Sequence, residues 1–399
     1  MSHRNLLLAA LTCMMLQCIS RASNNDRLGD LGSTLQKLPQ ALAPRIQFWD
    51  GGVVAFTDAY YRINADDTPP EIVTVADLEK IVSLGGTLSK PLALGMADGR
   101  LKLYEKKDGA WNAIKLPKAL QDAKAPNLIP STRDAAMLND RTLFRFKDGK
   151  WAITSLPPVP HFYRFFWPKS LPPKRLGFGS KQVLYGSRLF ATWNKGEFGG
   201  MVTVFDLTRP KDGWQQVSGH KSVSSHGIVG NQPITGITID PNMQLWVSEG
   251  LNHRGTVESG LYRYNGSEWD TVVQGWYDIF GEFASKESGR LRFTEGITDV
   301  LDVVQGEDGK LYVLTGMLGI FTYGDSALKR ELPFNFSRDS NPQTDTHDVE
   351  YGVNCEPETL VVDGSGNLYV STGYYGILCF VPDGKKYHLK QIILPGAKE

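Results

Sequence analysis

Short segments in which hydrophobic and polar residues alternate recur along the chain, and three of them share one wording. They are DPNMQLWVSEG from Asp240, GEDGKLYVLTG from Gly306 and DGSGNLYVSTG from Asp363. In each, a polar turn precedes Leu, an aromatic residue, Val, two further residues and Gly. Alternation with a period of two is typical of a strand with one buried face, so each segment predicts a turn that leads into a half-buried strand.

A hairpin is predicted directly after each of these strands. The downstream segments are GLYRYNGSEW from Gly260, GIFTYGDSAL from Gly319 and GILCFVPDGKKY from Gly376. Each reads as a strand, a glycine-containing turn and a returning strand. One unit of the pattern therefore holds four strands in series.

The hairpin half of the unit also recurs upstream, where each copy has a tryptophan just after its turn. The copies are LKLYEKKDGAWNAIKL from Leu101, TLFRFKDGKWAITSL from Thr142 and MVTVFDLTRPKDGWQQV from Met201. Four tryptophans stand just after such a turn: Trp111, Trp151, Trp214 and, in the unit that begins at Asp240, Trp269. A large aromatic side chain at one fixed point of each unit can fill the wedge between stacked sheets. Repetition every 40 to 65 residues or roughly so, with no helical periodicity, predicts a β-propeller.

We therefore predict an all-β chain that forms a single β-propeller of four-stranded antiparallel blades over residues 45–396. Seven blades fit best, although six or eight also fit the spacing. Residues 24–44 are expected to form an N-terminal tether or an extra edge strand. The predicted blades span residues 45–79, 80–125, 126–160, 178–219, 232–273, 296–333 and 356–396.

The repeat wording resembles that of a known class of propellers. DGSGNLYVSTGYYGIL and GLYRYNGSEWDTV are similar to the repeat of two-component-regulator propellers, and streptogramin lyase-like and NHL propellers use similar phrases. The clear match covers roughly residues 235–395, whereas the first half matches only through its hairpins. The resemblance implies a sensor-like propeller fold, and such wording specifies packing rather than activity.

The N-terminus has the pattern of an export signal. MSHRN supplies a short basic stretch, and the apolar run LLLAALTCMMLQCI follows it from Leu6 to Ile19. This run is shorter than the stretch of about 20 residues that spans a bilayer, so we predict a signal peptide over residues 1–23 and no membrane span in the mature chain. A lipoprotein cleaved before Cys13 or Cys18 is the alternative. The protein is expected to be exported, to the periplasm or the outside of the cell.

The charge content narrows the classes of binding partner, and the cysteine content limits the possible disulfides. Lys plus Arg and Asp plus Glu are 43 each, without a long basic run, which argues against nucleic-acid binding. The mature chain keeps Cys355 and Cys379, one before the first strand of the last blade and one on its third strand. A disulfide and two partly buried thiols both fit the sequence. We expect a monomer.

Loop lengths predict which face of the propeller carries function. Turns from first to second and from third to fourth strands are short, whereas loops on the opposite face are long and include residues 156–179, 219–232, 251–259, 274–295 and 334–356. Short turns save ordering entropy, and scaffolds place their binding residues on long loops. The long-loop face around the propeller axis is therefore the predicted binding surface.

Candidate ligand-binding residues lie on this face. They are His226, His253, Arg254, Glu295, His347, Glu356, Glu358, Tyr374 and Tyr375. Carboxylate and imidazole groups are ligands for divalent cations, so Glu295, Glu356 and Glu358 are also candidate ligands of a cation such as Ca²⁺. For any one of these residues, ordinary loop polarity is the competing interpretation.

Three functions fit these residues. The first is an exported propeller that binds a small molecule, glycan or protein segment without catalysis, and we favour it because the sequence has no G-x-S-x-G or H-E-x-x-H motif. The second is a lactonase-like hydrolase or lyase with a divalent cation at the mouth of the axis. The third is an interaction scaffold for another exported protein.

Overall fold

The computed structural model describes a large part of the chain outside its N-terminal segment. The described residues are 35–38, 43–87, 90–121, 123, 126–131, 135–158, 181–194, 200–216, 234–240, 242, 244–253, 256–264, 269–278, 300–316, 319–324, 327–334, 336, 355–384 and 386–395. Their secondary structure is almost entirely β, with one short helix, α2 (Lys118–Gln121), and one 3-10 turn, η2 (Pro210–Asp212). No helix among these residues is long and apolar enough to cross a membrane.

The described strands form seven four-stranded sheets, and each sheet takes its strands in chain order. Blades 1 to 3 comprise β1 (Arg45–Trp49), β2 (Gly52–Phe56), β3 (Tyr60–Ile63), β4 (Glu71–Ile72); β5 (Lys80–Thr87), β6 (Lys90–Ala97), β7 (Arg100–Lys107), β8 (Ala110–Ile114); and β9 (Asn127–Ile129), β10 (Ala135–Asn139), β11 (Thr142–Lys147), β12 (Lys150–Ser155).

The remaining blades follow the same plan. Blades 4 and 5 comprise β13 (Lys181–Tyr185), β14 (Arg188–Asn194), β15 (Gly200–Asp206), β16 (Trp214–Gln216); and β17 (Ile234–Ile239), β18 (Leu245–His253), β19 (Thr256–Tyr264), β20 (Trp269–Asp278). Blades 6 and 7 comprise β21 (Val300–Gln305), β22 (Leu311–Thr315), β23 (Gly319–Gly324), β24 (Ala327–Leu332); and β25 (Pro357–Val362), β26 (Leu368–Thr372), β27 (Gly376–Asp383), β28 (Lys386–Ile392).

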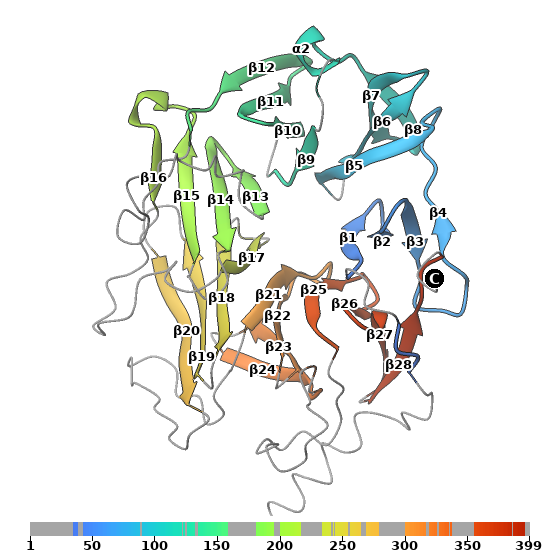
Figure 1. Ribbon diagram of the computed structural model, residues 1–399, viewed down its shortest axis with the longest axis vertical. Helices are drawn as coiled ribbons and strands as arrows, with labels where there is room; N and C mark the ends of the chain where they lie inside the picture. The colour runs from blue at the N-terminus through green and yellow to red at the C-terminus, as the bar shows by residue number, and fades with distance from the viewer. Residues whose placement is uncertain are drawn as a thin grey trace, which may run out of the picture.

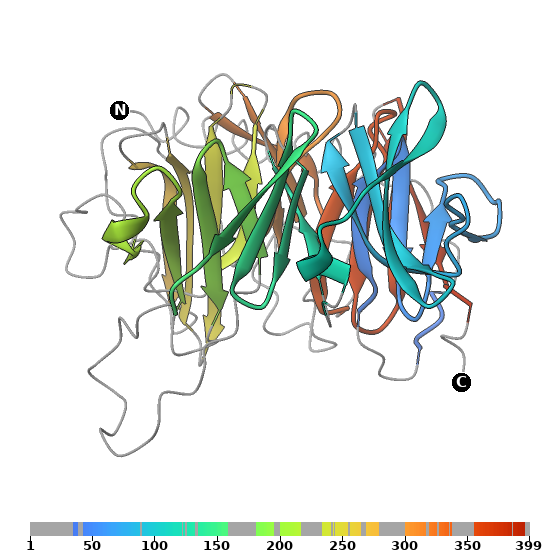
Figure 2. The ribbon, with the colours of Figure 1, turned by 90° about the horizontal axis from the view of Figure 1, so that it is seen from above.

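These sheets are arranged as a ring, with the first strand of each blade innermost (Figure 1). Seen from the side, the ring is a disc whose strands run between its two faces (Figure 2). The fold is thus a seven-bladed β-propeller, which confirms the predicted fold class and blade count. The predicted blade limits enclose the observed strands except in blade 5, where β20 runs to Asp278, past the predicted limit at residue 273.

The hydrophobic core is divided among the interfaces between neighbouring blades. Seven clusters of buried side chains each join two adjacent blades. One of them closes the ring, because Ile46 and Ile63 of blade 1 pack there with Tyr369 and Ile377 of blade 7. Burial of apolar surface between sheets therefore holds the circle shut.

The tryptophans that follow the turns lie between blades, as predicted. Trp111 stacks on Trp49 of blade 1 with 5.5 Å between ring centroids. Trp151 donates its indole N–H to the backbone oxygen of Lys115 at 2.8 Å, and Trp214 donates to that of Pro157 at 2.9 Å. In both cases the acceptor lies just after the last strand of the preceding blade, so each indole ties its blade to the one before it.

An aspartate in the first turn explains the wording of the repeat. In blade 5, Asp240 accepts the indole N–H of Trp246 at 2.9 Å. In blade 7, Asp363 accepts the hydroxyl of Tyr369 at 3.1 Å. In blade 6 the equivalent acceptor for Tyr312 is Asp308, at 2.9 Å. We call this contact the aspartate–aromatic clasp; it fixes the turn and satisfies the polar group of a largely buried ring.

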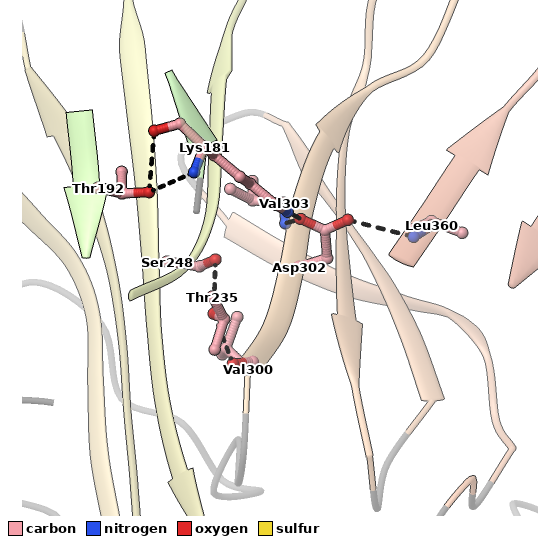
Figure 3. A network of polar contacts seen from close by, with 8 residues as sticks. All are labelled: Lys181, Thr192, Thr235, Ser248, Val300, Asp302, Val303 and Leu360. Carbon is pink, nitrogen blue, oxygen red and sulfur yellow. Dashed lines mark hydrogen bonds and ion pairs between the residues drawn. The ribbon is translucent and has the colours of Figure 1, made fainter. Parts of the chain in front are cut away.

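A polar network near the axis connects blades 4, 6 and 7 (Figure 3). The Nζ atom of Lys181 lies 2.8 Å from Oδ1 of Asp302, whose residue is 1% exposed. Asp302 also accepts the backbone N–H of Val303 at 3.0 Å and that of Leu360 at 3.2 Å. A Cβ at Gly236 of blade 5 would lie 2.7 Å from Asp302 Oδ1, so glycine leaves the room that this contact across blade 5 needs.

The two faces of the disc differ in the lengths of their connections. The face where each blade joins the next, here the connection face, has links over residues 156–180, 217–233, 279–299 and 333–356. On the opposite face, here the hairpin face, the longest links between strands are residues 64–70 and 207–213. The strand limits therefore agree with a connection face that carries the long segments.

One predicted loop is wrong. Residues 251–259 do not form a long loop, because β18 and β19 continue through them and pair as far as His253 with Thr256. The segment predicted as 274–295 also begins as strand, since β20 extends to Asp278. The prediction failed because main-chain pairing between β18 and β19 continues past the last apolar position of the hairpin, where the sequence no longer alternates.

Candidate ligand-binding site

The structure describes only part of the predicted site. His226, Arg254, Glu295 and His347 lie outside the described residues. His253 is the last residue of β18, and its side chain is also outside them. The other candidates, Glu356, Glu358, Tyr374 and Tyr375, all lie in blade 7.

The four candidates in blade 7 gather where the chain enters the blade. Glu356 directly precedes β25, and Glu358 is the second residue of that innermost strand. Tyr374 and Tyr375 form the turn between β26 and β27. Entry segments and second-to-third turns share the connection face, so the fold places this group on the face with the long links.

Glu356 is held in an unusual conformation beside this turn. Its φ is 50°, in the left-handed region that non-glycine residues rarely adopt. The backbone N–H of Gly373 donates to the backbone oxygens of Cys355 and Glu356, both at 3.0 Å. A Cβ at Gly373 would lie 2.9 Å from Glu356 Oε2, so the glycine lets the carboxylate lie against the turn.

Tyr374 and Glu356 form a direct pair. The Tyr374 hydroxyl donates to Glu356 Oε1 at 2.8 Å. This hydrogen bond to the carboxylate raises the pKa of the Tyr374 phenol above its ordinary value. The result is a partly exposed aromatic ring with a negative charge fixed at its hydroxyl end.

Glu358 lies at an irregularity of the innermost strand. The pairing of β25 with β26 shifts between Pro357 and Thr359, which leaves Glu358 as the extra residue of a β-bulge. Burial raises the pKa of the Glu358 carboxyl, the charge of Glu356 raises it further, and Arg45 of blade 1 opposes both. Glu358 is therefore within electrostatic reach of both the neighbouring carboxylate and the seam with blade 1.

Tyr375 contributes mainly packing. Its ring is partly buried against the cluster between blades 6 and 7. Its backbone N–H donates to Thr372 Oγ1 at 3.1 Å, and its backbone oxygen accepts from Gln391 Nε2 at 3.0 Å. Burial raises the pKa of its phenol. These contacts set the shape of the turn on which Tyr374 is presented.

Residues 35–38, here the strap, add contacts that the sequence does not reveal. The Leu38 N–H donates to the backbone oxygen of Tyr374 at 2.7 Å. Nζ of Lys37 lies 4.8 Å from the centroid of the Tyr374 ring, within the range of a cation–π interaction. The partners are more than 300 positions apart along the chain, and Lys37 stands in no motif, so no sequence signal could have identified it.

The metal prediction stays a prediction, because the described residues include only part of the proposed ligand set. Two of the three proposed ligands, Glu356 and Glu358, lie in the same blade, while Glu295 is outside the described residues. Among the described residues no group of three or more His, Cys, Asp or Glu side chains could hold a metal ion. Cys355 and Cys379 are free, buried thiols that belong to clusters on different interfaces of blade 7.

Comparison with known proteins finds similarity in solved structures alone. No family model and no curated protein matches the chain. A YCF48 protein bound to a D1 peptide is 12% identical over 82% of this chain and 85% of its own, with a TM-score of 0.41. A Bacteroides uniformis protein assigned as a 6-phosphogluconolactonase is 14% identical over 89% of this chain and 97% of its own, with a TM-score of 0.42.

The extracellular domain of a hybrid two-component system from B. thetaiotaomicron is 11% identical, with a TM-score of 0.40. The match covers 86% of this chain but only 41% of the chain of that protein, so the present chain spans less than half of its length. The propeller fold that the resemblance to two-component-regulator propellers implies is confirmed by the seven four-stranded blades of the structure itself. At these identities the likeness is to the fold alone.

Proposed function

We propose that the protein is an exported binding propeller that holds a small molecule, glycan or protein segment on its connection face, without catalysis. The observation that supports this most is the difference between the two faces, since four links on the connection face, 156–180, 217–233, 279–299 and 333–356, are far longer than any link between described strands on the hairpin face. Ordering a long segment costs conformational entropy, and scaffolds keep such segments where they contact ligands.

The group in blade 7 supplies suitable chemistry on that face. Glu356 and Glu358 are exposed, and Tyr374 is partly exposed between Glu356 and the strap. Carboxylates accept hydrogen bonds from hydroxyl and ammonium groups, and a tyrosine ring offers a flat apolar contact at little entropic cost. This combination favours a polar ligand that approaches along the axis.

The export part of the proposal rests on the sequence. The basic start and the apolar run from Leu6 to Ile19 have the organisation of a signal peptide. A chain fused to a reporter that is active only outside the cytoplasm tests this directly. Reporter activity that is lost when Leu6–Leu11 is replaced by polar residues would support export, and activity that persists would contradict it.

A ligand screen tests the binding proposal. Thermal unfolding of the purified chain is followed with collections of oligosaccharides, metabolites and peptides, since a ligand of the native state raises the melting temperature by mass action. Hits are then measured on Glu356→Gln and on Glu71→Gln, a control carboxylate on the outer strand β4, where it is exposed. We expect Glu356→Gln to weaken binding and Glu71→Gln to leave it unchanged. Hits that neither variant weakens, or turnover of a hit, would contradict the proposal.

A further inference from the structure

The strap is attached to blade 7 without joining its sheet. Its backbone meets the side chain of Gln391, which accepts the Gln36 N–H at 2.8 Å and donates to the Gln36 oxygen at 2.6 Å. Leu38 is 5% exposed, whereas Gln36 and Lys37 are exposed. The strap is no part of any strand ladder, so it can leave blade 7 without breaking a sheet.

The strap presents a cation to the candidate site. The Lys37 ammonium lies over the face of Tyr374, and the hydroxyl of the same ring donates to Glu356. Glu358 adds a second carboxylate whose electrostatic interaction with Glu356 is unfavourable. An aromatic face with a carboxylate at its edge is an arrangement that recognises ammonium groups, and here a side chain of the protein itself fills it.

We propose that Lys37 is an internal ligand, which occupies in cis a recognition site for a primary ammonium group formed by Tyr374 and Glu356. A lysine side chain of a bound protein segment takes the place of Lys37 and releases the strap. The strap then acts as an autoinhibitory contact, because a ligand must compete with an ammonium group already tethered beside the ring. This inference rests on the proposed binding function and narrows its ligand to an ammonium-bearing one.

Four variants of the purified chain separate this role from a structural one. Lys37→Met keeps most of the aliphatic side chain and removes the charge. Lys107→Met is the matched control, since Lys107 is an exposed lysine that ends β7 at a hairpin-face turn. Tyr374→Leu and Tyr374→Phe, each combined with Lys37→Met, remove the ring or only its hydroxyl. The probe is Nα-acetyl-lysine methylamide, and the uncharged norleucine analogue serves as its reference.

The affinities for the probe decide the matter. Removal of the internal competitor should tighten binding of the lysine probe by about fivefold or more in Lys37→Met, while Lys107→Met matches the wild type. Tyr374→Leu should abolish this gain, Tyr374→Phe should reduce it, and the norleucine probe should not bind. Hydrogen exchange at the Leu38 amide should also speed up when the lysine probe is added to the wild type, because its acceptor is the Tyr374 oxygen.

Equal affinity of Lys37→Met and wild type for the lysine probe, or a gain that survives Tyr374→Leu, overturns the inference. These outcomes are distinct from failure of the proposed function. A ligand from the screen that binds the connection face equally well in wild type, Lys37→Met and the Tyr374 variants overturns only the ammonium site. A ligand that maps to the hairpin face overturns both.

Discussion

Blades 5 to 7 and blades 2 to 4 are built with different polar contacts around similar strands. Blades 5 to 7 carry the aspartate–aromatic clasp, whose partners are four to six residues apart. Blades 3 and 4 instead use tryptophans whose acceptors, in the blade before, are 36 and 57 residues away. Blade 2 relies on the stack of Trp111 on Trp49. The first device stabilises a turn within one blade, and the second stabilises the seam between two.

This difference explains why the part of the repeat that contains the first turn and the second strand can be recognised only in the second half of the chain. A clasp needs its aspartate and aromatic residue at a fixed short spacing, so it leaves a phrase in the sequence. A tie between blades constrains only the tryptophan, because its acceptor is a backbone oxygen that any residue supplies. Blades with similar packing can therefore be encoded by sequences that contain a recurring motif or by sequences that lack one.

The largest effect is expected at Asp302, where the two halves of the ring meet. Asp302→Ala should lower the free energy of unfolding by about 3–5 kcal/mol, since it leaves a lysine and two amides without their acceptor. Lys181→Met should cost less, because the Lys181 side chain is 37% exposed while that of Asp302 is 2% exposed. Urea unfolding measures both. Equal losses, or a loss below about 1 kcal/mol for Asp302→Ala, would show that the axial network does not join the blades.

The ties between blades come next. Trp214 is 5% exposed, and Trp214→Ala should cost about 3–5 kcal/mol because a large buried side chain and its hydrogen bond are lost together. Trp151→Ala should cost clearly less, since Trp151 is only half-buried. Thermal unfolding of the two variants gives the comparison. The reverse order would mean that the seams do not depend on buried tryptophan.

The clasp should matter less than either. Asp363 accepts hydrogen bonds from Ser365, Asn367 and Tyr369, so Asp363→Ala is expected to cost about 1–3 kcal/mol. Tyr369→Phe should cost about 1 kcal/mol. A double-mutant cycle measures their coupling, which we expect to be favourable. Strictly additive losses would mean that Asp363 and Tyr369 do not stabilise each other, and the clasp could then not explain the recurring motif.

The smallest effect concerns the pH dependence of stability at Glu358. A carboxyl group whose pKa is raised on folding binds protons more tightly when folded, so it opposes folding as the pH rises through its unfolded pKa. Glu358→Gln should therefore stabilise the fold near pH 7, by no more than about 1 kcal/mol because the group is exposed, and have little effect near pH 4. Melting temperatures at the two pH values test this. A variant that is destabilised at pH 7 would contradict the assigned direction.

Most of the fold could be predicted from the sequence because its signals are local. The alternation around Leu368 and Tyr369 and the glycine-containing turns specify strands and hairpins within a few residues of each other. The pairing beyond Gly250 in blade 5 could not be predicted, since main-chain hydrogen bonds continue there without a hydrophobic pattern. That is why the segment 251–259 reads as a loop in the sequence.

The candidate site could be predicted only where it belongs to a blade. Glu356, Glu358 and Tyr374 stand at defined points of the repeat, so the topology places them on one face. Lys37 and Arg45 join them from the other end of the chain, and their proximity depends on closure of the ring. Contacts that form when the first and last parts of the chain meet involve no fixed sequence spacing, so no motif in the sequence indicates them.

The central claim is that ligands bind the connection face. Hydrogen–deuterium exchange of the purified chain, with and without a ligand from the screen, tests it most directly. We predict slower exchange in residues 333–356 and 373–375 and in the other long links, with unchanged exchange in the hairpin-face links 64–70 and 207–213. Protection confined to the hairpin-face links would contradict the claim.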